Sequence, residues 1–375
     1  MREQSKITLR PGGLTNTERT DWLRLTRTQR VGPVTFFQLL SRFDSAGAAL
    51  DALPTIANRS RNIVPASDSE IERELQAVNE LGARIICVPD PDYPPLLKQF
   101  SHPPPVLTVL GDITLAQRRC VAIVGARQAS AGGRKIAREI ARELSEAGFS
   151  VVSGLARGID GEAHAASLAG GTIAVLGGGI DHIYPPQHDR LYSEIARQGL
   201  LVSENPFGHR ATARDFPRRN RIITGIAEGV VIIEAAERSG SLISARTALE
   251  QDREVMSVPG SPLDPRSAGS NRLLREGATL VRHAEDIIEA LSRSTIQQIE
   301  APPAPDYGVE TEDANKIPDQ QIDRVMSVLG PTPVTIADIA LAAQLNVTRC
   351  AAILVELELA GRARTYSGGL ASIAL

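Results

Sequence analysis

The chain has 375 residues, a length that predicts two or three domains rather than one small module. Hydrophobic residues make up 42% and charged residues 23% of the chain, globular averages that exclude a disordered, collagenous or coiled-coil protein. The net charge of −3 does not attract polyanions to the whole molecule, so any nucleic-acid site is expected to be a local basic patch.

Residues 1–70 are expected to form a small helical domain. Three helical segments, TDWLRLTRTQR, VGPVTFFQLLSRF and SAGAALDAL, lie between residues 16 and 57, and Gly32-Pro33 forms a turn between the first two. A helix, a glycine turn and a second helix resemble the helix-hairpin-helix and SAM-like modules that sometimes hold a nucleic-acid backbone. The plainer interpretation, a bundle packed on the main domain, is favoured because such loops are common.

Residues 71–293 alternate helical and apolar segments. EIERELQAVNELGA precedes the apolar run RIICV, and the alternation then repeats many times from residue 118. The strand candidates, each rich in Val and Ile, are CVAIVG, SVVSG, TIAVLGG, LLVSE, VVIIEA and EVMSVPG. Amphipathic stretches such as GRKIAREIARELSEAG and LISARTALEQDR lie between them. The pattern predicts an α/β fold, a Rossmann-like doubly wound and mostly parallel sheet covered on both faces.

A linker and a third domain are expected after this sheet. Residues 294–318 lose all periodicity and collect Pro and acidic side chains, the composition of a linker. Residues 319–375 contain three short helical segments followed by RARTYSGGLASIAL, which predicts a two-stranded wing and hence a winged helix. Its five acidic side chains slightly outnumber its four arginines. A DNA-reading winged helix carries a basic stripe, so this one is expected to contact protein instead.

Candidate ligand-binding residues follow the ends of the predicted strands, where an open parallel sheet binds its ligands. VAIVGARQASAGGRK, VVSGLARGIDGEAH and AVLGGGIDHIYPP place glycines before helix starts, whose free N–H groups attract anions. Neither the G-x-G-x-x-G nor the G-x-x-x-x-G-K-[ST] pattern occurs, so neither NAD nor ATP is indicated. The residues predicted to form an anion site are Gly125, Arg127, Ser130, Ser153, Gly154, Arg157 and Gly158.

The segment FPRRNRIITGIAEG adds three arginines within four residues at another junction between a loop and a helix. A guanidinium fork matches two phosphate oxygens, so these side chains are expected to contact phosphates, and their loops are expected to face solvent. SGSLISARTALE supplies a further helix start. The candidates here are Phe216, Arg218, Arg219, Asn220, Arg221, Ser239, Gly240 and Ser241.

Taken in order, these motifs resemble the DNA-processing protein A family, DprA or Smf, over about residues 90 to 290. The resemblance is carried by VGARQAS, SGLARGIDGEAH, TIAVLGGGIDHIYPP, LLVSENPFG, FPRRNRII, EAAERSGSLISARTALEQDREVMSVPG and SNRLLREGA. DPDYPPLL with PPPVLTVLGD is similar to the family's lead-in, and both end domains are similar to accessory domains of some members. One departure is GGRK after GARQAS, where members often have an aromatic residue followed by Gly.

The resemblance implies a single-stranded DNA binding protein that protects incoming DNA, loads a RecA-type recombinase during natural transformation, and works as a homodimer. Arg127 and the segment Arg218–Arg221 would then hold phosphates, and Phe216 would touch a base. The residues alone indicate an anionic ligand and do not select DNA over a nucleotide. With one Trp, five Tyr and seven Phe, the chain lacks an extended stacking platform, so phosphate contacts are expected to dominate.

A catalytic interpretation is the alternative. Asp160 and His164 are four residues apart on one helix face, but a helix cap and a satisfied buried histidine explain them, with Asp160 as the expected N-cap. Glu162 points elsewhere, and His188 is expected on the surface. SGSLISARTALE resembles phosphate loops of Rossmann-type phosphoribohydrolases, in which Glu250 would be catalytic, although the paired glycines are missing. A pure interaction adaptor is a third class, and no enzyme activity is expected.

The cysteines and the N-terminal segment give no signal for a disulfide, a metal site or secretion. Cys87, Cys120 and Cys350 lie far apart without a C-x-x-C pair, so neither disulfides nor a metal site are indicated. MREQSKITLRPGG has no apolar core of a signal peptide, and no run of about 18 apolar residues occurs. A cytoplasmic protein with no cofactor, no metal and no membrane contact is therefore expected.

Overall fold

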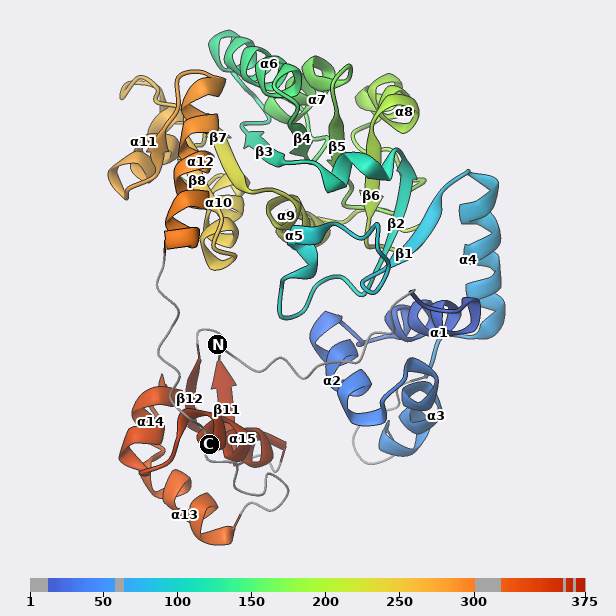
Figure 1. Ribbon diagram of the computed structural model, residues 1–375, viewed down its shortest axis with the longest axis vertical. Coiled ribbons are helices and arrows are strands. Elements are labelled where there is room, and N and C mark those ends of the chain that lie inside the picture. The colour runs from blue at the N-terminus through green and yellow to red at the C-terminus, as the bar shows by residue number, and fades with distance from the viewer. Residues whose placement is uncertain (1–12, 58–63, 301–317, 360–361, 367–368, 375) are drawn as a thin grey trace. The chain divides into compact units, whose positions relative to one another are not determined.

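The computed structural model describes residues 13–57, 64–300, 318–359, 362–366 and 369–374. Two compact units, residues 1–301 and 302–375, divide the chain (Figure 1). Among the described residues, no helix combines the length and the apolar character needed to span a bilayer.

A nine-stranded sheet is the centre of the first unit. Its strands are β1 (Arg84–Cys87), β2 (Val106–Gly111), β3 (Cys120–Gly125), β4 (Ser150–Ser153), β5 (Thr172–Val175), β6 (Leu200–Ser203), β7 (Gly229–Ile233), β8 (Glu254–Ser257) and β9 (Thr279–Leu280). The spatial order is β1-β2-β6-β5-β4-β3-β7-β8-β9. From β6 to β9 all neighbours are parallel, whereas β1 and β2 form an antiparallel edge. Seven strands of this sheet were predicted and are confirmed, but β2 and β9 were not predicted.

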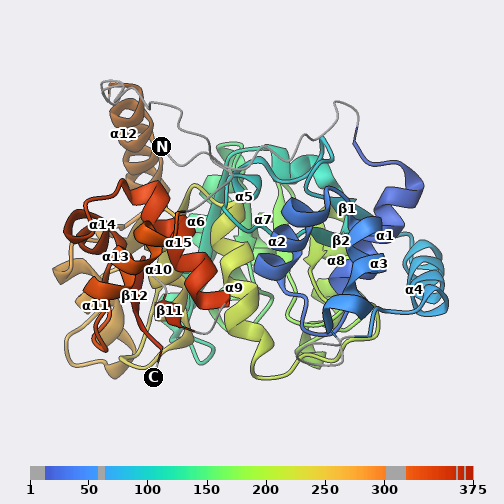
Figure 2. The same cartoon turned by 90° about the horizontal axis from the view of Figure 1, so that it is seen from below.

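Helices cover both faces of this sheet because its strands are apolar on both sides. Val121 and Ile123 of β3 pack in one cluster with α6 (Ala131–Glu146), α7 (Ile159–Ser167) and α12 (Ala284–Glu300). Ala122 and Val124, which alternate with them, pack in another cluster with α9 (Asp215–Ile226) and α10 (Gly240–Glu250). Helices α9 and α10 lie side by side (Figure 2). The doubly wound α/β fold predicted from the sequence is thus confirmed.

The direction of winding reverses next to β3. From β3 the chain moves outward through β4, β5 and β6, with α8 (Asp189–Gln198) before β6, and α9 then returns it to β7 on the opposite side of β3. Loops that leave β3 and β7 therefore diverge to opposite faces, which opens a crevice at their carboxyl ends.

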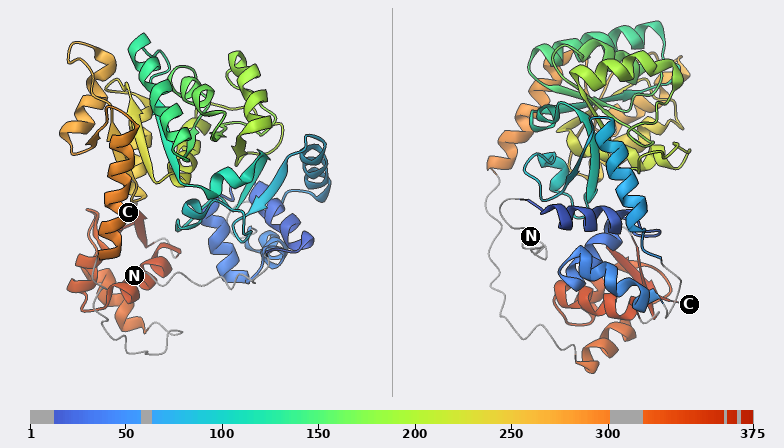
Figure 3. Two further views of the ribbon diagram at one scale, coloured as in Figure 1. Left: turned by 45° about the horizontal axis from the view of Figure 1, so that its top comes forward. Right: turned by 90° about the vertical axis from the view of Figure 1, so that its right-hand side faces the viewer.

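A bundle of four N-terminal helices packs against the β1–β2 edge of the sheet through its first and fourth helices (Figure 3). The four helices are α1 (Asn16–Arg27), α2 (Pro33–Phe43), α3 (Ala46–Ala57) and α4 (Asp68–Glu80). The Arg27 guanidinium forms a buried ion pair with Glu74 at 2.8 Å and donates to the Glu204 carbonyl oxygen at 3.0 Å. Trp22 and Phe36 join the same hydrophobic cluster as the sheet. These contacts fix α1–α4 to the sheet.

The second unit is a winged helix, as predicted. It contains α13 (Asp319–Val328), α14 (Ile336–Ala342) and α15 (Val347–Leu359), with antiparallel strands β10 (Val334–Thr335), β12 (Leu370–Ile373) and β11 (Ala363–Tyr366) in that order. The short strand β10 was not predicted. Helix α12 continues to Glu300, past the expected start of the linker at residue 294, and residues 301–317 of that linker lie outside the described residues.

Two short helices and three 3-10 turns complete the described part of the first unit. The helices are α5 (Pro95–Lys98), which packs on α9, and α11 (Ala268–Arg275), which packs on β8. The 3-10 turns lie at Ile113–Gln117, Pro186–His188 and Pro265–Ser267.

Candidate functional site

A cavity of about 430 Å³ opens at the carboxyl ends of β3 and β7, where the winding reverses. We call it the switch-point cavity. It brings together eight of the predicted residues, namely Gly125, Arg127, Phe216, Arg219, Asn220, Ser239, Gly240 and Ser241. They come from the β3 loop and from the N-terminal turns of α9 and α10. Sequence segments more than a hundred residues apart therefore form one site, at the position where doubly wound sheets bind ligands.

Arg127 supplies an exposed positive charge at this cavity. Its Cζ lies 5.2 Å from the centre of the Phe216 ring, a cation–π contact. No hydrogen bond or ion pair to Arg127 occurs among the described residues, so its guanidinium is free to bind an anion. The ring of Tyr184, 42% exposed, lies 5.4 Å from that of Phe216. Tyr184 was missed, although it follows the third glycine segment.

Arg219 carries a second charge beneath the cavity, with only 6% of its surface exposed. Its Nη1 donates to the Val175 carbonyl oxygen at 2.8 Å, and its buried Nε has no hydrogen-bond partner. Burial lowers the pKa of Arg219 to about 10, against the opposing effect of Asp160, so the side chain is charged at neutral pH. The expectation that this segment faces solvent was wrong for Arg219, because α9 turns it toward the sheet.

The glycines of the second segment serve internal packing. A Cβ at Gly154 would lie 1.6 Å from Arg219 Nη1. A Cβ at Gly158 would lie 2.2 Å from the Ala126 carbonyl oxygen, and its φ of +79° favours glycine. Both residues are buried, as is Ser153, whose hydroxyl donates to the Ile123 carbonyl oxygen at 2.6 Å. None of the three lines the switch-point cavity. These three residues pack beneath the cavity and hold its lining in place.

The N-terminus of α6 is already occupied by a carboxylate of this chain. The Ser130 N–H donates to Glu234 Oε2 at 2.8 Å, and its hydroxyl donates to Glu234 Oε1. The same hydroxyl accepts from the Gly133 N–H at 2.9 Å, which caps α6. Ser130 is thus engaged by Glu234 and does not line the cavity. Sequence reasoning missed Glu234, which follows β7 with φ of +54°.

The remaining arginines lie elsewhere. Arg157 is exposed and lines neither of the two cavities described here. Arg218 and Arg221 line a second cavity of about 330 Å³ on the other side of α9. Arg221 is ion-paired with Glu204, whereas Arg218 has no hydrogen-bond or ion-pair partner within the described ranges. Arg266, which was not predicted, lines the switch-point cavity and pairs with Asp264 at 2.8 Å.

The groups considered for catalysis have structural partners. His164 is fully buried, with Nδ1 2.7 Å from Thr172 Oγ1 and Nε2 accepting from the Leu155 N–H at 3.3 Å. Burial lowers its pKa to about 3. Asp160 lines the switch-point cavity, but its carboxylate accepts from the N–H groups of Gly154 and Ala156, and burial raises its pKa. It does not cap α7, because the N-cap is Gly158.

The other two groups considered for catalysis, His188 and Glu250, line neither cavity. His188 is half-buried, not a surface residue, and its Nδ1 lies 3.0 Å from the Leu155 carbonyl oxygen. Glu250 is exposed at the end of α10. Within the described part of the chain, no three His, Cys, Asp or Glu side chains form a group able to hold a metal ion. The geometry therefore supports anion binding better than acid–base chemistry.

Comparison with known families gives three matches along the chain. The family described as DNA recombination-mediator protein A matches residues 84–292. The DprA-like N-terminal HHH domain matches residues 16–77, and the DprA winged helix domain matches residues 309–369. The three matches follow the order of the helical segment, the sheet and the winged helix.

Individual relatives agree with these matches. Protein Smf of Escherichia coli is 38% identical over 302 residues, 80% of each chain, and the DNA processing protein DprA of Bacillus subtilis is 42% identical over 234 residues, 62% of this chain and 79% of that protein. The solved structure of DNA processing protein A from Streptococcus pneumoniae has a TM-score of 0.58 and 32% identity, covering 77% of this chain and 98% of its own. The Helicobacter pylori structure, which concerns a single-stranded DNA binding mode, has a TM-score of 0.52 and 29% identity over 56% of this chain and 96% of its own.

Proposed function

This chain belongs to the DprA/Smf family of DNA recombination mediators, and from that membership we propose that its switch-point cavity binds the backbone of single-stranded DNA. The observation that carries the proposal is the free Arg127 guanidinium over the Phe216 ring at the cavity. It offers a charge for a phosphate beside an aromatic ring for a base. At the N-terminal turn of α10, the Ser239 N–H donates to the Ala236 carbonyl oxygen and the Ser241 N–H to the Ser239 hydroxyl, which leaves the Gly240 N–H for a phosphate.

A DNA strand is favoured over a free nucleotide because of Glu234. In Rossmann folds that bind dinucleotides, the helix after the first strand receives the pyrophosphate at its N-terminus. Here the corresponding helix α6 has a carboxylate at that place. A nucleotide phosphate at α6 would be repelled, and the remaining anion-binding groups lie toward α9 and α10. A strand that passes over the cavity can bind those groups without placing a phosphate at the N-terminus of α6.

The cellular role that we propose is the one that the family resemblance implies. The protein protects incoming single-stranded DNA, loads a RecA-type recombinase during natural transformation, and works as a cytoplasmic homodimer without catalysing a reaction. The name of the matching family and the single-stranded DNA described for the Helicobacter pylori protein support this role. The predicted site residues that line neither cavity, Ser130, Ser153, Gly154, Arg157 and Gly158, are proposed to act by supporting the switch-point cavity or by contacting DNA beyond it.

The experiment is a salt titration of oligonucleotide affinity. Wild-type protein should prefer single strands to matched duplexes, because the cavity admits one backbone. Arg127→Ala should weaken binding and reduce the slope of log affinity against log salt by about 0.7, the value for one phosphate contact on a single strand. The control is Arg142→Ala, which removes an equal charge from α6, away from the cavity. Equal affinity for both strand types, or an unchanged slope, would refute the proposal.

A further inference from the structure

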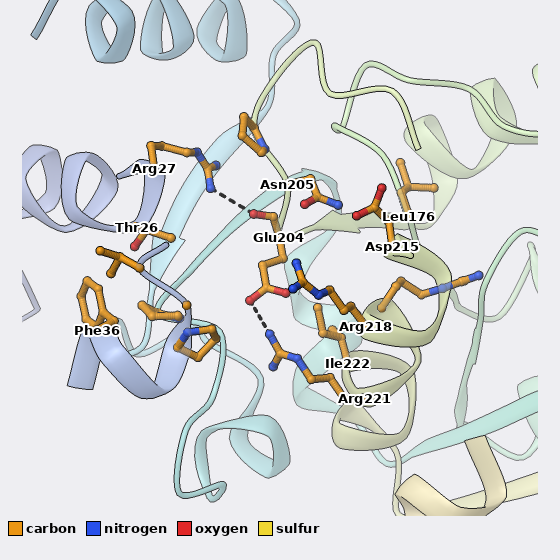
Figure 4. Close-up of a pocket in the computed structure, with 16 residues that line it drawn as sticks. Thr26, Arg27, Phe36, Leu176, Glu204, Asn205, Asp215, Arg218, Arg221 and Ile222 are labelled. Carbon is orange, nitrogen blue, oxygen red and sulfur yellow. Dashed lines mark hydrogen bonds and ion pairs between the residues drawn. The ribbon is translucent and has the colours of Figure 1, made fainter. Parts of the chain in front are cut away.

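The second cavity, of about 330 Å³, lies between the α1–α2 hairpin and α9 within the first unit. We call it the hairpin cavity. Figure 4 shows Arg27 reaching into it from α1 and Arg218 and Arg221 from α9, with Glu204 between them. Phe36, Pro33 and Ile222 form apolar parts of its wall. Its volume falls in the range of small-ligand sites, at the lower end.

Cations outnumber anions in the lining of the hairpin cavity. The arginines are Arg27, Arg218, Arg219 and Arg221, and the acids are Glu204 and Asp215.

Both carboxylates of the lining are already satisfied. Glu204 pairs with Arg221. Asp215 accepts from the Thr212 N–H at 2.8 Å and lies 3.0 Å from His209 Nε2. Arg218 is exposed and has no hydrogen-bond or ion-pair partner in the described part of the chain. A positive charge therefore remains available in this cavity for an anion.

The start of α2 adds one backbone donor to the same cavity. Its N-cap is Gly32, which has no side chain to cap the helix, and its first turn contains no acidic residue. Pro33 has no N–H and the Phe36 N–H donates to the Gly32 carbonyl oxygen, so the Gly32 N–H is the donor that this lining keeps for another acceptor. An independent feature is the buried Arg219 Nε, which lacks a hydrogen-bond partner, and Arg219 lines both cavities.

Helix α9 is the wall between the two cavities. Phe216, Asn220 and Ile223, at helical spacing, line the switch-point cavity. Asp215, Arg218 and Ile222, on the neighbouring face, line the hairpin cavity, and Arg219 lies between the two faces. A ligand in one cavity is therefore separated from a ligand in the other by the width of one helix.

We propose that the hairpin cavity is a second phosphate subsite, in which Arg218 and the Gly32 N–H hold a later phosphodiester of the strand whose earlier part occupies the switch-point cavity. The proposal rests on the proposed function. A strand that crosses the N-terminal end of α9 passes Arg127, Arg219 and Arg218 in that order. The negative charges of its phosphates therefore have positive charges near them along the path. Phe36 is buried, so Pro33, which is partly exposed, is the apolar contact for a sugar or base.

The test measures affinity against strand length with the full chain. Oligothymidylates of roughly 4 to 16 nucleotides are titrated against wild type, Arg218→Ala and Arg218→Glu. Short strands, which fill only the switch-point cavity, should bind all three proteins alike. Longer strands should bind Arg218→Glu at least roughly tenfold more weakly than wild type, because a charged hydrogen bond is replaced by repulsion. Arg218→Ala should lose about 0.7 of the salt slope for long strands only.

The matched control is Arg214→Glu, a charge reversal of an exposed residue that precedes α9 and lines neither cavity. It should leave the length dependence unchanged. If Arg218→Glu binds long strands like wild type while Arg127→Ala does not, the hairpin cavity is no subsite but the proposed function stands. If Arg127→Ala also binds normally, the proposed function itself fails. Thymidine monophosphate that binds wild type, but not Arg218→Glu, would show a free-nucleotide site and overturn the shared-strand proposal.

Discussion

At the scale of single residues, Arg127 and Arg219 perform different tasks although both line the switch-point cavity. Arg127 is exposed, so its contribution is confined to ligand binding. Arg219 lies under the cavity next to the buried Asp160 and packs on Gly154. The arginine beneath the cavity is therefore part of both the folded structure and the binding site.

Replacement of Arg219 by Met should therefore destabilise the fold. It removes the positive charge that favours the ionised form of the buried Asp160, and an uncompensated buried charge costs about 3 to 5 kcal/mol. Arg127→Ala should change the unfolding free energy by less than about 0.5 kcal/mol, because surface substitutions have small effects. Urea unfolding of both variants measures the difference. Wild-type stability in Arg219→Met would show that its charge plays no part in folding.

His164 should make stability depend on pH. Burial lowers its folded-state pKa to about 3, so between that pH and about 6.5 the unfolded chain binds a proton that the folded chain does not. Its contribution is present above about pH 6.5 and is lost as the pH falls, by about 1.4 kcal/mol per pH unit. Urea unfolding at about pH 7.5 and about pH 5.5 should show this loss in wild type and a smaller one in His164→Gln. Equal losses would exclude His164 as the cause.

At the scale of elements, α6 begins on a carboxylate supplied by the end of β7. Glu234 holds Ser130 through its backbone N–H and its hydroxyl, and a Cβ at Gly133 would lie 2.5 Å from the Glu234 carboxyl carbon. Glu234 adopts a φ of +54°, which is uncommon for a residue with a side chain. The contact joins the loops after β3 and β7, the two strands that flank the switch point.

Glu234→Ala should free the N-terminus of α6. Loss of the carboxylate contacts should lower the unfolding free energy by about 1 to 2 kcal/mol, the usual cost of losing a cap. Inorganic phosphate should then raise the melting temperature of Glu234→Ala more than that of wild type, because an anion takes the vacated place. Glu234→Gln, which keeps an acceptor without the charge, is the control and should lie between the two. A phosphate effect of equal size in all three proteins would contradict this account.

The elements themselves were largely predictable from sequence, since runs such as CVAIVG and VVIIEA are short, apolar and bounded by turn residues. Strand β2 was missed because VLTVLG follows a proline-rich segment that reads as a loop. The site was predictable as a set of strand ends. The direction of each side chain was not predictable, because a rotation of α9 by one residue moves a side chain from the solvent to the sheet. Partners distant in sequence, such as Glu234 for Ser130, left no local signal.

At the scale of the whole molecule, the winged helix is a separate unit with its own hydrophobic cluster. Both cavities lie in the first unit. A protein that ends at residue 301 should therefore keep most of its affinity for single-stranded DNA, and its salt slope should be unchanged within about 0.7. Fluorescence anisotropy with a labelled strand compares the two proteins. Loss of nearly all affinity would make the winged helix the main DNA-binding part.

The shared hydrophobic cluster of α1–α4 and the sheet has a consequence for heating. Trp22, Phe36 and Ile222 belong to one cluster, and Arg27 bonds both to α4 and to the end of β6. The N-terminal helices cannot melt while leaving the sheet intact, since they would expose its apolar edge to water. The cooperative unfolding units are therefore set by packing and not by the three family matches. The chain should unfold in two calorimetric transitions, and the transition of residues 1–301 should have the larger enthalpy.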